Sequence, residues 1–119
     1  LAYKEKEHAA VVVMNVQHQW LATEVISIGT KNGCLFHPDE AFEAALKHDG
    51  KRIIIAHNHP SGELSPSPED IQLTKQMVRG GYLLNVPVLD HLIIGNGDFK
   101  SIRQATSIWE EIEQERKNR

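Results

Sequence analysis

Two histidines near the middle of the chain, His57 and His59, are spaced so that they could bind one metal ion. They follow the short β-branched run 52–56, which predicts a buried strand. Alternate residues of a strand point to the same face, so the two imidazoles would lie together, with backbone positions about 6 to 7 Å apart. Both rings could then reach one ion at about 2.0–2.1 Å, the distance that zinc takes from an imidazole nitrogen.

An aspartate in the helix that follows can supply a third ligand. Ser67 suits the N-cap of this helix, Pro68 suits its first position, and Glu69 and Asp70 favour the positive end of its dipole. A strand end, a tight turn and a helix start can bring Asp70 back over the two histidines. Two imidazoles and one carboxylate leave the fourth position of a tetrahedral zinc ion to water, which is the arrangement of a catalytic site.

The same residues also have a simpler interpretation. Asp70 could be only the acidic half of a capping box with Ser67, and His57 and His59 could be polar residues that close a strand. Taken together, the two histidines, the turn rich in Pro, Ser and Gly, and the acidic helix start favour the metal site.

The spacing of these residues carries a family resemblance. His-x-His, seven residues and Ser-x-x-Asp match the JAMM signature of MPN-domain metalloproteases without a gap. The stretches HNHPSG (57–62), PSPEDI (66–71) and LDHLIIG (89–95) more narrowly resemble the bacterial RadC branch, and the resemblance covers about residues 7 to 103. It implies a three-layer α/β/α mixed sheet, an MPN (JAB) domain related to the cytidine deaminase fold. It also implies one zinc ion with a bound water as nucleophile.

The resemblance suggests further roles. MPN proteases place a glutamate base at the start of the first strand, and Glu7 occupies that position here; the alternative is a solvated charge at a strand end, with Glu24 as the fallback base. Ser67 could cap its helix, or donate to the oxyanion of the tetrahedral intermediate, or do both. Asp90 and His91 resemble the second motif of the family, and we expect them to support the site rather than to bind the metal.

The hydrophobic pattern predicts the elements that must position these residues. The expected strands are 9–14, 20–28, 52–56, 86–89 and 91–94. The first expected helix begins at Pro38 and ends at Gly50, and the second begins at Pro68 and ends at Gly80–Gly81. A third helix is expected through 105–112, with Trp109 in the core and a frayed tail over 113–119. Alternation of strands and helices predicts an α/β domain, a mixed sheet with helices on its faces.

Size and composition predict one globular domain over residues 1–119. The chain is 40% hydrophobic and 24% charged, and its longest apolar runs are far too short to span a membrane. The single cysteine, Cys34, excludes an internal disulfide, and the first ten residues do not read as a signal peptide. We therefore expect a cytoplasmic protein without membrane association. Because the chain does not begin with Met, we also expect it to be the C-terminal part of a longer one.

Two functions remain open at this point. The first is a zinc metallopeptidase that hydrolyses peptide or isopeptide bonds of an unidentified protein or peptide substrate. The alternative is a non-catalytic zinc-binding interaction module of a DNA-maintenance protein, since the RadC name is historically associated with DNA repair. The net charge of −3, with Lys and Arg scattered, argues against direct DNA binding by this domain. RadC-like proteins usually carry a helix-hairpin-helix segment upstream, where such contact could lie.

Overall fold

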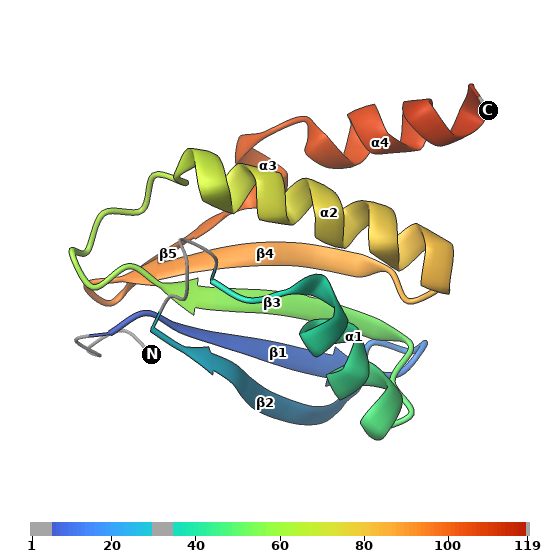
Figure 1. Ribbon diagram of the computed structural model, residues 1–119, viewed down its shortest axis with the longest axis horizontal. Helices are drawn as coiled ribbons and strands as arrows, with labels where there is room; N and C mark the ends of the chain where they lie inside the picture. Colours follow the sequence, from blue (N-terminus) through green and yellow to red (C-terminus); the bar gives the residue numbers. More distant parts are fainter. Residues whose placement is uncertain (1–5, 30–34, 119) are drawn as a thin grey trace.

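A computed structural model describes residues 6–29 and 35–118 of the chain, and Cys34 lies outside these residues. The described elements follow one another in this order (Figure 1): β1 His8–Met14, β2 Trp20–Ile28, α1 Pro38–Lys47, β3 Arg52–Asn58, α2 Pro68–Leu84, β4 Val88–Gly95, β5 Asp98–Ser101, α3 Ile102–Ala105 and α4 Ile108–Lys117. Within the described part of the chain, no helix combines the length and the apolar character needed to cross a membrane.

The strands form one mixed sheet, as the sequence predicts. Their order is β2-β1-β3-β4-β5, with β3 and β4 parallel and the other neighbours antiparallel. The apolar residues of β1 and β3 occupy the centre of this sheet, which explains why both strands lack a polar face. The α/β class predicted from the alternation of elements is confirmed.

The helices α1 and α2 lie on the same face of the sheet. Val11, Ile55 and His91 are paired across β1, β3 and β4, so their side chains share one face. The helix α2 contacts this face at His91, and α1 approaches α2 where Phe42 lies against Gly80. The connections β2-α1-β3 and β3-α2-β4 cross the sheet in the same direction, and two right-handed crossovers of this kind place their helices on one face.

The opposite face of the sheet, called the open face below, carries many apolar side chains. Neither α1 nor α2 lies over it, although the sequence analysis expected helices on both faces. Its β2 and β5 residues are largely exposed: Trp20 by 67%, Val25 by 55% and Phe99 by 61%. Apolar side chains of the central strands lie between them on this face: Val12, Ile54, Leu92 and Ile94.

Two helices run further than their sequences predict. The helix α2 does not stop at Gly80–Gly81 but continues to Leu84, and Asn85 ends it in the left-handed conformation at φ 58°. The glycines serve packing instead, because a Cβ on Gly81 would lie 2.8 Å from the carbonyl oxygen of Val86. At the C-terminus, α4 extends to Lys117 and is not frayed over 113–117.

Contacts with α2 explain the length of α4. Arg79 of α2 forms an ion pair with Glu115 at 3.0 Å, and the guanidinium of Arg116 lies 4.2 Å from the centre of the Tyr82 ring. Trp109 is buried, as predicted, and its indole N–H donates to the carbonyl oxygen of Val88 at 2.8 Å. The expected strands 86–89 and 91–94 are one strand, β4, with a shift of register beside Ile53 and Ile54.

Candidate metal centre

The end of β3 fixes the two histidines. The strand runs two residues beyond the predicted 52–56, so His57 is its penultimate residue and is fully buried. Asn58 points to the opposite face, where its side chain accepts from the backbone N–H of His8 and donates to the carbonyl oxygen of Lys6 at 3.1 Å. The same short stretch therefore directs imidazoles into the site and anchors the start of β1.

The N-terminus of α2 fixes the aspartate. The hydroxyl of Ser67 accepts from the N–H of Asp70 at 3.1 Å, and Oδ2 of Asp70 accepts from the N–H of Ser67 at 2.9 Å. These reciprocal bonds form a capping box, so the predicted N-cap is confirmed. Because both ends of the box are bonded, the Asp70 carboxylate is held in one orientation with only 5% of the residue exposed.

Three predicted ligands converge at this point. Nε2 of His57 lies 3.0 Å from Nε2 of His59 and 3.3 Å from Oδ1 of Asp70, and Nε2 of His59 lies 3.0 Å from Oδ2 of Asp70. Tetrahedral ligands at about 2.0–2.1 Å from zinc are about 3.3 Å apart, so each of these three separations is close to the spacing of two ligands on one ion. Two imidazole nitrogens at 3.0 Å also need a proton or a cation between them, because two lone pairs would repel.

The electrostatics of the site suit a cation. Burial would by itself raise the pKa of Asp70, but the neighbouring imidazoles of His57 and His59, with the N–H of Ser67, hold this pKa well below its ordinary value. The carboxylate is therefore ionised at neutral pH. Nδ1 of His59 lies 2.7 Å from the carbonyl oxygen of Glu63, which can only accept. Neutral His59 therefore carries its proton on Nδ1 and leaves Nε2 unprotonated, as a metal ligand requires.

His91 lies behind His57, not among the three converging ligands. Its Nε2 is 2.7 Å from Nδ1 of His57, and its Nδ1 is 2.7 Å from the hydroxyl of Thr74. Burial, with a further contribution from His57, lowers the pKa of His91 to about 3, so the ring is neutral. The expected supporting position of His91 agrees with these contacts. Thr74 had no predicted role in the site, and its position four residues after Asp70, on the same side of the helix, was the available signal.

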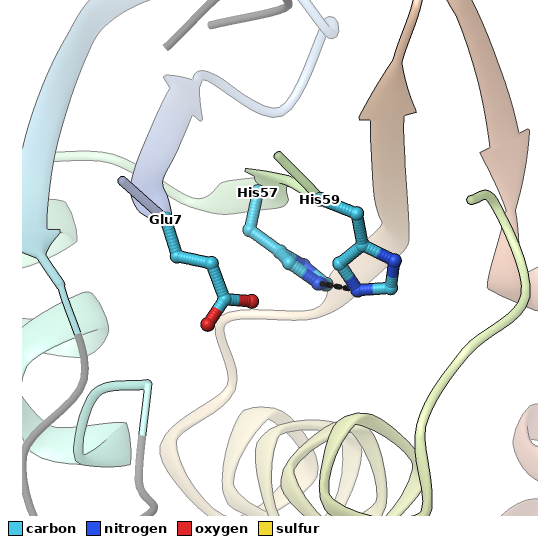
Figure 2. A group of neighbouring side chains, drawn as sticks. All are labelled: Glu7, His57 and His59. Atoms are coloured by element: carbon cyan, nitrogen blue, oxygen red, sulfur yellow. Dashed lines mark hydrogen bonds between the residues drawn. The ribbon is translucent and has the colours of Figure 1, made fainter. Parts of the chain in front are cut away.

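Glu7 reaches the site from the other side. Its carboxylate belongs to a group with His57 and His59 whose ligand atoms all lie within 4.8 Å of one another, and Figure 2 shows it directed toward the two rings. Glu7 also lines a shallow depression together with Lys6, Gly29, His59, Pro60 and Ser61.

The fallback base, Glu24, is engaged elsewhere. Its carboxylate pairs with Lys47 at 3.0 Å and with His48 at 3.1 Å, both near the C-terminal end of α1. The structure therefore favours Glu7 over Glu24 as the acidic group beside the histidines.

Comparisons with known proteins agree with this geometry. A family model described as "RadC-like JAB domain" matches residues 1–107. The chain is 47% identical to a UPF0758 protein of Acaryochloris marina over 115 residues, which are 97% of this chain and 47% of that protein. It is 49% identical to a UPF0758 protein of Synechocystis sp. over 114 residues, 96% of this chain and 47% of that protein. The chain thus spans about half the length of these curated relatives.

Proposed function

Because this chain belongs to the RadC-like JAB domain family, we propose that it is a zinc-dependent hydrolase of peptide or isopeptide bonds. The convergence of His57, His59 and Asp70, in which each side chain lies within 3.3 Å of the other two, carries this proposal. The donor set of two imidazoles and one carboxylate leaves a position for water, which distinguishes catalytic zinc sites from closed structural ones.

The ion would supply a Lewis acid and a water whose pKa is lowered toward 7. In the proposed mechanism, Glu7 takes the proton of the attacking water and returns it to the leaving nitrogen. Its partly exposed position beside the depression allows contact with both groups. Ser67 accepts one hydrogen bond at the helix cap, and its own hydroxyl hydrogen can be donated to the oxyanion of the tetrahedral intermediate.

The substrate enters, in this proposal, through the depression beside Glu7. Lys6, Pro60 and Ser61 line it, and its openness to solvent suits a segment of polypeptide rather than an enclosed small molecule. We further propose that the protein acts in the cytoplasm and that this domain does not itself bind DNA.

The first test is the zinc content of the purified protein. Elemental analysis should give about one zinc ion per chain, and His59→Ala should lose it. His48→Ala is the matched control, because it removes an imidazole that pairs with Glu24 and lies outside the site. Absence of zinc from the wild type, even after zinc is supplied, would overturn the proposal. Zinc that binds and stabilises without any hydrolysis would favour the interaction module instead.

A further inference from the structure

A chain of buried hydrogen bonds runs from His57 to the backbone of α2. Nδ1 of His57 contacts His91, Nδ1 of His91 contacts Thr74, and the hydroxyl of Thr74 donates to the carbonyl oxygen of Asp70; each of the three distances is 2.7 Å. His57 and Thr74 are fully buried and His91 is 1% exposed, so water does not compete for these groups.

The donors and acceptors in this series of hydrogen bonds allow only one direction of donation. A carbonyl oxygen can only accept, so at 2.7 Å the single hydroxyl hydrogen of Thr74 must point to Asp70. The hydroxyl oxygen then faces Nδ1 of His91 with a lone pair. Nδ1 of His91 must therefore carry a hydrogen and donate it to Thr74.

The same reasoning determines which nitrogen of His57, the ring that faces the candidate metal centre, carries the hydrogen. A charged imidazolium at His91 would be buried against Thr74 and His57 without a carboxylate on either ring nitrogen, which is costly. Neutral His91 with its hydrogen on Nδ1 has a bare Nε2, and this atom accepts from Nδ1 of His57. His57 then has no hydrogen on Nε2, the atom that faces His59 and Asp70.

We propose that Thr74 and His91 are positioning residues that fix His57 in the tautomer able to bind the metal. This inference rests on the metal binding proposed above. Asp70 then has two roles in the site. Its carboxylate is a proposed ligand, and its backbone carbonyl determines the direction of the hydrogen bonds from His57 through His91 and Thr74, called the relay below. Loss of the Thr74 hydroxyl removes the acceptor for His91. The relay can then reverse, which places a hydrogen on Nε2 of His57 where the ion must bind.

The test compares Thr74→Val, which keeps the shape of the side chain without its hydroxyl, with Thr74→Ser, which keeps the hydroxyl. Long-range ¹H–¹⁵N NMR spectra of the metal-free protein report the tautomer of each histidine. We expect His57 protonated on Nδ1 in the wild type and in Thr74→Ser, where Nε2 of His59 then carries the hydrogen that the metal-free site needs between the two rings. In Thr74→Val we expect His57 protonated at least partly on Nε2. Zinc affinity, measured by competition with a chromogenic chelator, should fall about 10- to 100-fold in Thr74→Val alone.

The two measurements separate this inference from the proposed function. If metal-free wild type carries its His57 hydrogen on Nε2, the relay is wrong whether or not zinc binds. If Thr74→Val folds with the wild-type tautomer and the wild-type zinc affinity, the positioning role is also wrong. If the wild type has the expected tautomer but binds no zinc, the proposed function fails while the direction of the relay stands.

Discussion

Glu7 and Glu24 show how single residues of the same type acquire different roles. Glu7 immediately precedes β1 and Glu24 lies on β2, and both were candidates for the catalytic base. The side chain of Glu24 pairs with Lys47 and His48, whereas the carboxylate of Glu7 lies with His57 and His59. The start of β1 is held in place by Asn58, so the position of Glu7 depends on the same strand end as the histidines.

Replacement of Glu7 by Gln should remove hydrolysis and keep the metal. A general base contributes about 10²- to 10⁴-fold to a rate, and the amide has no basic site for the proton. The measurement is kcat on whichever peptide or isopeptide substrate the wild type accepts, together with zinc content. Glu63→Gln is the control, because only the backbone carbonyl of Glu63 contacts His59. Normal turnover by Glu7→Gln would exclude it as the base, and loss of zinc would make it a ligand instead.

The candidate site could be predicted from sequence to the extent that local spacing determines it. His57 and His59 are two residues apart in a strand, and the capping box brings Asp70 to a fixed place relative to Ser67. The contact between His91 and Thr74 could not be predicted in this way, because β4 and α2 meet only in the folded domain and no residue spacing within either element indicates it. Glu7 could be placed only by resemblance, since no local motif surrounds it.

At the scale of elements, α2 shows where sequence rules were overridden by packing. Two adjacent glycines usually end a helix, yet α2 continues past Gly80 and Gly81 to Leu84. At Gly81 the returning chain passes so closely that a Cβ would lie 2.8 Å from the carbonyl oxygen of Val86 and 3.2 Å from the backbone nitrogen of Val88. This close approach is a tertiary contact, and the sequence of the helix alone does not reveal it.

Gly81→Ala should therefore destabilise the domain. Alanine gains about 1 kcal/mol of helix propensity, but overpacking against backbone atoms costs about 1–3 kcal/mol, so we expect a net loss of about 1 kcal/mol. Chemical denaturation monitored by circular dichroism measures the change in the free energy of unfolding. Gln76→Ala, at an exposed position of the same helix, should change it by less than about 0.5 kcal/mol. A stabilised Gly81→Ala protein would show that the backbone can move away at little cost.

At the scale of the whole molecule, the two faces of the sheet differ. The face under α1 and α2 carries the core and the candidate metal centre, whereas the open face presents apolar side chains from all five strands. The strand order and the mixed sheet follow from the alternation of elements and the preferred hand of crossovers. The expectation of helices on both faces came from the family fold, and β2-α1-β3 and β3-α2-β4 instead place both helices together.

The open face predicts binding of a hydrophobic dye by the native protein. Contiguous exposed apolar surface of this kind binds 8-anilinonaphthalene-1-sulfonate, whose fluorescence then rises. Phe99→Lys, at a position 61% exposed on the open face, should lower that fluorescence and leave the thermal midpoint nearly unchanged. Leu83→Lys is the control, because Leu83 is 78% exposed but belongs to α2. An equal loss of fluorescence in both variants would contradict this account of the open face.

The oxygen shared between the helix cap and the candidate metal centre has a thermodynamic consequence for the entire fold. Oδ2 of Asp70 accepts from the N–H of Ser67 and also lies 3.0 Å from Nε2 of His59, so the first turn of α2 and the ligand set assume their geometry together. An ion that binds only this ordered state adds to the stability of the folded chain by linkage, about 2.7 kcal/mol when free metal is 100 times Kd. Chelation should then lower the thermal midpoint, and amide hydrogen exchange should accelerate first at the N-terminus of α2. The fraction of the protein that holds metal would therefore control the stability of the folded domain.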